Sequence, residues 1–175
     1  LKNQSNSREK HLKAFYHVES NSMLELEPPK HTRLRGLVLR AFTTRKINTI
    51  QPEIAALSYK LLDDLKSNNV DILKGFATQL PVIVIARLLG VPETMAQDLL
   101  SWSNDMVMMY QARRTKELEI KANSSTKEFV SFMEKYIEEK RYKPEDDLIS
   151  HLIAAEQAGE KLTKDELIST CILLL

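Results

Sequence analysis

Residues 28–46 read PPKHTRLRGLVLRAFTTRK. The proline pair predicts that a helix begins here and runs to about Thr43, because the missing N–H of proline costs nothing at the first helical position. Six residues of the stretch are basic and none is acidic. The sequence therefore predicts a helix with local positive charge, in a chain whose net charge is only +1.

Helical periodicity divides the basic residues of this helix between two faces. At about 100° per residue, His31 and Arg35 fall on the apolar face that includes Leu34. Arg33 and Arg40 fall on the opposite face and are expected to point toward solvent. A buried guanidinium is costly without an anionic partner, so the face with His31 and Arg35 is expected to meet an acidic group.

The residues alone leave the nature of that acidic group open. In the more common arrangement, Arg35 extends its charged end to solvent or pairs with a carboxylate of the protein. In the alternative arrangement, this face of the helix binds an anionic cofactor. The outer face, with Arg33 and Arg40, is either a docking surface for an acidic partner or an ordinary solvated surface.

The rest of the sequence predicts a single, mainly α domain. Only 4 Gly and 6 Pro occur in 175 residues, which argues against a turn-rich all-β fold. A short strand at 70–73 and a buried strand at 77–90 remain open. Segments 92–114 and 115–141 are expected to pair as a helical hairpin. The other helical segments expected are a turn at 8–16, 44–67 with a break at Pro52, 77–90 with a stop at Gly90, 144–158, and a final helix begun by a capping box from Thr163 to Glu166.

Composition excludes several classes of protein. Hydrophobic residues make up 43% of the chain and charged residues 28%, which is typical of a folded domain. No apolar run approaches the roughly 20 residues of a membrane span. The near-neutral charge gives no general case for binding nucleic acid. The single cysteine, Cys171, excludes an internal disulfide and favours a cytoplasmic location.

Other residues with reactive side chains give weak signals. Cys171 lies in an apolar segment without a basic neighbour, so a core position is expected rather than a reactive thiolate. His11, His17 and His151 lack the spacing of metal ligands, and no metal site is predicted. For the patch MVMMY at 106–110, core packing is favoured over a ligand site. The chain starts without methionine and ends in the apolar run CILLL, so we expect an internal segment of a longer protein.

Four segments resemble soluble bacterial cytochrome P450 enzymes, in the order in which that family has them. Residues 22–43 resemble the region of helix C, and this motif is specific. The other segments are Ile85–Pro92, Asp147–Ala155 and Leu162–Leu175. The resemblance implies a partial cytochrome P450 domain over 1–175, mainly α with little β. It would comprise the loop between helices B and C (1–27) and helices C to the first half of I (28–175), the N-terminal and central portion of the fold.

The same resemblance implies roles for the basic residues of the first helix. His31 and Arg35 occupy the positions that bind the propionates of haem b, which would supply the expected anion. Arg33 and Arg40 would lie on the surface where a ferredoxin or flavodoxin docks to deliver electrons.

The resemblance also implies an activity and a substrate pocket. The complete protein would be a monooxygenase that hydroxylates a small hydrophobic organic substrate with O2, and Met106, Met109 and Leu173 would border that substrate. The chain lacks the ExxR motif and the cysteine loop that ligates iron, and Cys171 does not match that ligand. No catalytic residue is therefore assigned, and this chain alone is not expected to catalyse. The alternative is a helical ligand-binding or dimerisation module without haem.

Overall fold

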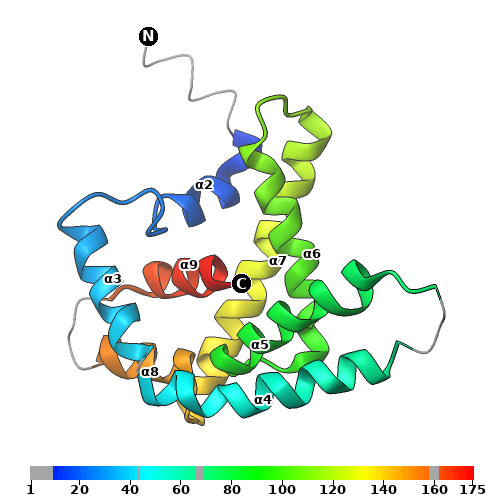
Figure 1. The fold of residues 1–175 in the computed structure, drawn as a ribbon. Helices are drawn as coiled ribbons and strands as arrows, with labels where there is room; N and C mark the ends of the chain where they lie inside the picture. Colours follow the sequence, from blue (N-terminus) through cyan, green and yellow to red (C-terminus); the bar gives the residue numbers. More distant parts are fainter. Residues whose placement is uncertain (1–9, 43, 66–68, 158–161) are drawn as a thin grey trace.

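The described part of the chain is built from helices. The structure, a computed structural model, describes residues 10–42, 44–65, 69–157 and 162–175, and these include no β-strand (Figure 1). The mainly α prediction is therefore confirmed. The α-helices are α2 (Lys13–Glu19), α3 (Lys30–Ala41), α4 (Thr44–Asp63), α5 (Gln79–Leu89), α6 (Ala96–Val107), α7 (Lys116–Tyr142), α8 (Leu148–Gln157) and α9 (Lys164–Leu174), and the short helical turns are η1 (Lys10–Leu12), η2 (Leu73–Ala77), η3 (Glu93–Met95) and η4 (Met108–Tyr110).

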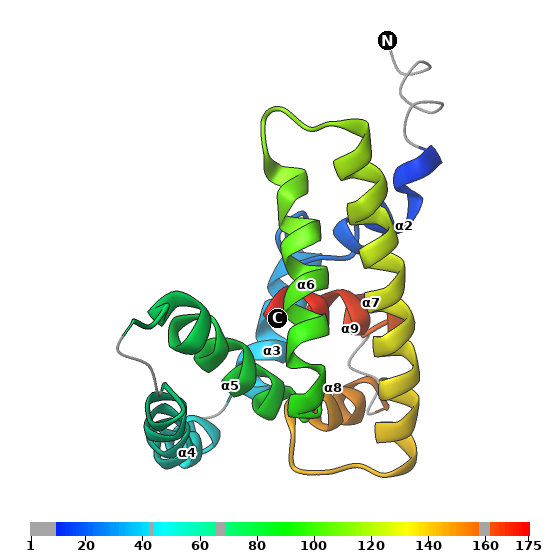
Figure 2. The same cartoon turned by 90° about the vertical axis from the view of Figure 1, so that its right-hand side faces the viewer.

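The predicted hairpin of α6 and α7 forms the frame of the molecule. Helices α2, α8 and α9 all pack on α7, and α5 packs on α6. Figure 2 shows the hairpin upright, with α4 and α5 projecting to one side of it. Helix α9 runs across the hairpin, so its C-terminal end lies near the centre of the molecule (Figures 1 and 2).

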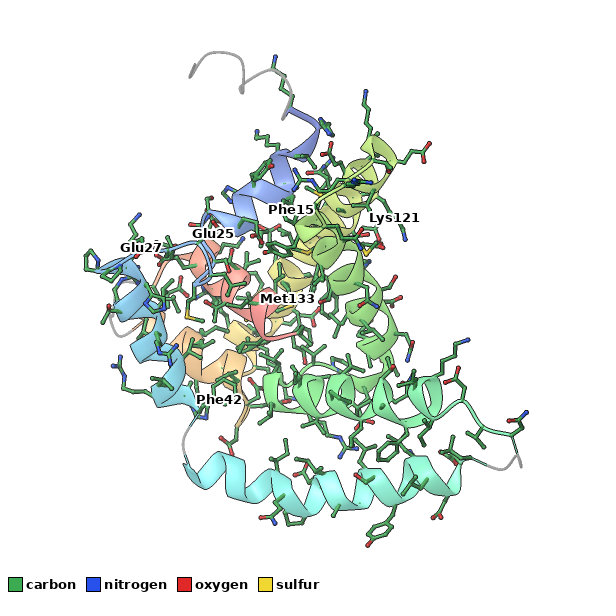
Figure 3. The ribbon with its side chains drawn as sticks, turned by 45° about the horizontal axis from the view of Figure 1, so that its top comes forward. Phe15, Glu25, Glu27, Phe42, Lys121 and Met133 are labelled. Carbon is green, nitrogen blue, oxygen red and sulfur yellow. The ribbon has the colours of Figure 1, made fainter. Side chains whose placement is uncertain are left out.

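The core forms around one face of α7. Phe129, Met133 and Ile137 follow one another at four-residue spacing and are fully buried, as expected for the inward face of an amphipathic helix. They belong to the same apolar cluster as Leu167 and Cys171 of α9. Met133 lies among the packed side chains at the centre of the molecule (Figure 3). Burial on this face fixes α9 against the hairpin.

Two of the predicted helix boundaries are confirmed by their local chemistry. The Thr163 side chain accepts a hydrogen bond from the backbone N–H of Glu166 at 3.2 Å, and the Glu166 carboxylate accepts one from the N–H of Thr163 at 3.0 Å. This reciprocal pair begins α9. Gly90 ends α5 in the left-handed region at φ 83°, where glycine carries no steric penalty.

Two expectations about the elements are wrong, and one alternative left open is excluded. Helix α4 continues through Pro52, because proline removes a single backbone donor while the helix still packs on α5. The segment at 70–73 is not a strand, because the side chain of Asp71 accepts the N–H groups of Leu73 and Lys74 at 3.1 Å each and turns the chain into η2. Helix α8 begins at Leu148 rather than at 144.

Candidate functional site

Helix α3 carries most of the predicted site residues, and its buried face differs from the expected one. Leu34, Leu37 and Val38 are buried against the core, and the helix packs on α8. Because Leu37 is buried as well, the centre of the buried arc lies nearer to Arg33 than to Arg35.

The expected orientations of these two arginines are therefore wrong. Arg35 is exposed rather than buried. The side chain of Arg33, expected in solvent, is only 27% exposed, and its Nη2 donates to Oε1 of Glu166 at 2.5 Å. Burial of Glu166 by itself would raise the pKa of its carboxyl, but the hydrogen bonds from Arg33 and Thr163 outweigh it and lower that pKa below 4.5. Arg33 thus joins α3 to α9.

His31 and Arg35 lie one turn apart on α3 and leave their donors available. His31 is half-buried, and within the described part of the chain neither side chain has a hydrogen-bond or ion-pair partner. An imidazole N–H and a planar guanidinium are suited to binding carboxylates. The donor set therefore fits a ligand with two carboxylates. The fit rests on donor chemistry and spacing, since the burial expected for Arg35 is not observed.

The solvent-facing charge of α3 comes from other residues than those expected. Lys30 at the start of the helix and Arg40 in its last turn are exposed, together with Arg35. The charge of Arg33 is instead neutralised by Glu166. A basic surface on α3 is thus present, and of the two arginines expected on it, Arg40 is the exposed one.

A mostly apolar cavity lies at the C-terminal part of α9, away from the contact with Arg33. Its volume is about 110 Å³, and it is lined by the end of α2 with the following loop, the last part of α6 with η4, and the C-terminal part of α9. Met106 and Leu173, two of the predicted pocket residues, line it. Met109, the third, does not belong to the lining and is 1% exposed in the core. The cavity thus brings together three segments that are far apart in the sequence.

The cavity also contains a polar pair that the sequence did not indicate. The hydroxyl of Tyr110 donates to Oε2 of Glu19 at 2.6 Å, and both residues belong to the lining. Burial raises the pKa of Glu19, the hydrogen bond from Tyr110 lowers it, and the charge of Glu25 raises it again, with a net increase above 4.5. Burial and the carboxylate of Glu19 raise the pKa of Tyr110 above 10, so its hydroxyl stays protonated at neutral pH.

The remaining reactive side chains have structural positions. Cys171 is fully buried, and burial raises the pKa of its thiol to about 12, so the predicted core role is confirmed. His11, His17 and His151 each lie within 3.2 Å of a single carboxylate. The described residues include no group of three or more His, Cys, Asp or Glu side chains placed to hold a metal ion. None of the described helices is both long and apolar enough to cross a bilayer.

Comparison of sequences relates the chain to named cytochrome P450 proteins. It is 42% identical over 157 residues to polyketide biosynthesis cytochrome P450 PksS of Bacillus subtilis (strain 168), which covers 89% of this chain and 38% of that protein. It is 38% identical over 160 residues to putative cytochrome P450 YjiB of the same strain, with 89% and 40% covered. The chain spans about two fifths of the length of these relatives. No family model matches the chain.

Comparison of structures gives the same relationship. The crystal structure of P450BioI with a hexadec-9Z-enoic acid ligated acyl carrier protein matches with a TM-score of 0.86 and 31% identity, over 96% of this chain and 43% of that one. The structure of PksS matches with a TM-score of 0.77 and 37% identity, over 94% and 40%. The chain therefore belongs to the cytochrome P450 family, and its helices form a part of that fold.

Proposed function

We propose that the whole protein is a haem-dependent monooxygenase that hydroxylates a small hydrophobic organic substrate with O2. The observation that carries this proposal is the pair of hydrogen-bond donors, His31 and Arg35, at one face of α3 in a chain of this family. Neither side chain has a partner within the part of the chain that the structure describes. A relative that is 36% identical over 155 residues is named vitamin D(3) 25-hydroxylase, from Pseudonocardia autotrophica, which supports a hydroxylation.

The proposal gives the helices of the chain distinct tasks. His31 and Arg35 hold the two propionates of haem b through charge-assisted hydrogen bonds. Bound haem supplies the iron chemistry that activates O2. Met106 and Leu173 contact the apolar body of the substrate and keep water from it. Cys171 takes no part in the chemistry, because it is fully buried in the core.

The basic surface of α3 has a separate task in the same proposal. Arg40 is exposed and contributes to the surface on which an acidic ferredoxin or flavodoxin docks. Arg33 contributes less than its sequence position suggests, because Glu166 neutralises its charge. In this assignment, α3 is helix C and α9 is the first half of helix I, with residues 1–27 belonging to the loop before helix C.

The decisive experiment is a carbon monoxide difference spectrum of the reduced protein, expressed from its complete reading frame. A Soret band of the thiolate-ligated type is expected. Soluble, folded protein that incorporates no haem would overturn the proposal and favour a helical binding module. The reduced protein without carbon monoxide is the reference. Haem bound without a thiolate ligand is recognised because its Soret band lies at a different wavelength.

A further inference from the structure

The cavity between α2, α6 and α9 has one carboxylate side chain among the described residues of its wall. Val18, Met106 and Ile172 supply buried apolar surface. Among the lining residues that the structure describes, Glu19 is the one with a charged side chain. The position of this carboxylate distinguishes one end of the cavity from the rest.

The hydroxyl groups of two serines in the wall form hydrogen bonds with the backbone. Ser169 donates to the backbone carbonyl of Val18 at 3.0 Å, and Ser22 accepts from the N–H of Leu24 at 3.4 Å. The Glu19 carboxylate accepts one hydrogen bond, from Tyr110, while an ionised carboxylate offers about four acceptor positions. Glu19 therefore retains acceptor capacity toward a ligand.

The surroundings of Glu19 favour a cation over a neutral or anionic group. A ligand that filled the cavity would remove water from the carboxylate, which is costly unless the ligand supplies a compensating charge. None of the described residues in the lining is Lys, Arg or His. Glu25, in the loop between α2 and α3 (Figure 3), adds negative potential at this end, as its effect on the pKa of Glu19 shows.

We propose that the substrate carries a protonated amine, which binds the Glu19 carboxylate, on an aliphatic body that lies against Met106 and Ile172. This rests on the proposed function, because it takes the cavity as the share of the substrate site that the chain contributes. Tyr110 is a positioning residue in this arrangement, since its hydroxyl holds the carboxylate at the end of the cavity. A substrate with a carboxylate at the same end would be repelled by Glu19.

The test is calorimetric binding of three ligands to the haem-loaded protein from its complete reading frame. Octyltrimethylammonium, 1-octanol and octanoate share an octyl chain and differ in charge, and the quaternary ammonium has no lone pair with which to ligate iron. The ammonium ligand is expected to bind about tenfold more tightly than the alcohol, and octanoate more weakly than both. Glu19→Gln should abolish the preference for the ammonium ligand. Glu27→Gln is the control, because Glu27 is an exposed carboxylate in the loop after α2 and lies outside the cavity. This variant should retain the preference for the ammonium ligand.

Equal affinity of the unmodified protein for the ammonium ligand and the alcohol would overturn the inference, and so would an unchanged preference in Glu19→Gln. The ligand series on the unmodified protein decides the question if Glu19→Gln does not fold. Haem loading and the carbon monoxide spectrum are read separately. Protein with a thiolate-type spectrum but no preference refutes the amine alone, whereas protein without that spectrum refutes the proposed function.

Discussion

Arg33 and Glu166 are 133 positions apart in the sequence, and the guanidinium Nη2 lies 2.5 Å from the carboxylate Oε1. The contact joins α3, which carries His31 and Arg35, to the first turn of α9. The C-terminal part of α9 lines the cavity. The same carboxylate completes the capping box with Thr163. One buried side chain thus begins α9 and fixes the helix proposed to hold the cofactor.

Replacing Arg33 tests how much this contact stabilises the protein. Arg33→Met should lower the free energy of unfolding by about 1.5–3 kcal/mol, because it removes a charge-assisted hydrogen bond from a carboxylate that is only 7% exposed. Urea unfolding followed by circular dichroism measures the change. Lys30→Met, which removes an exposed charge from the same helix, should change it by less than about 0.5 kcal/mol. Equal effects of the two variants would show that the ion pair is not stabilising.

The same pair predicts a dependence of stability on pH. The pKa of Glu166 is lowered from 4.5 in the folded protein, so its contribution is fully present above 4.5 and is lost as the pH falls through the folded value. The free energy of unfolding should therefore fall less steeply below pH 4.5 in Arg33→Met than in the unmodified protein. Unfolding titrations on both sides of pH 4.5 measure the two slopes. Parallel slopes would mean that Arg33 does not hold the pKa down.

A second buried ion pair predicts a larger loss of stability. Lys140 Nζ lies 2.5 Å from Oδ2 of Asp147, with side chains that are 6% and 5% exposed. Lys140→Met should cost about 3–5 kcal/mol in thermal or urea unfolding, since it leaves Asp147 buried without its counter-ion. Lys143→Met, at an exposed position nearby, is the matched control. A loss below about 1 kcal/mol would show that Asp147 finds water or another donor.

The parts of the fold that depend on neighbouring residues could be predicted from the sequence. The capping box at Thr163 and the stop at Gly90 were found because each is a local rule of hydrogen bonding or backbone conformation. The strand left open at 70–73 is excluded by the hydrogen bonds to Asp71, which are equally local. Side-chain acceptors of this kind also occur in segments that do not turn, so they do not identify a turn from sequence.

The parts of the site that depend on distant residues could not be predicted in the same way. Periodicity within α3 places Arg33 in solvent, and it cannot indicate a partner such as Glu166, which belongs to a helix more than a hundred residues away. Glu19 lies in a mixed polar segment in which nothing indicates a binding site. It lines a cavity only because residues of α6 and α9 pack next to it in the fold. Met109 belongs to the same apolar run as Met106 but points into the core.

Two glycines offer opposite outcomes for the same substitution. Gly90→Ala should cost at least about 2 kcal/mol, because φ is 83° and a Cβ would overlap the carboxylate of Asp147. Gly36→Ala should stabilise by about 0.5–1 kcal/mol, because Gly36 lies inside α3 and a Cβ there would meet nothing nearer than Arg40 Nη1 at 3.9 Å. Melting temperatures of the two variants give the comparison. If Gly90→Ala does not lower the melting temperature, Asp147 can move away from the added Cβ, and its ion pair with Lys140 does not hold it in place.

The assignment of His31 and Arg35 to the haem propionates predicts weaker haem retention when both are removed. In the protein from its complete reading frame, His31→Ala with Arg35→Ala should speed the transfer of haem to an excess of a haem-scavenging apoprotein, because each charge-assisted hydrogen bond contributes about 1.5–3 kcal/mol. Transfer is followed by absorbance. Lys30→Ala with Arg40→Ala removes two exposed positive charges from the same helix and should leave the rate unchanged. If both double variants lose haem at the same rate, the helix acts through its general charge, and His31 and Arg35 have no specific part in anchoring the cofactor.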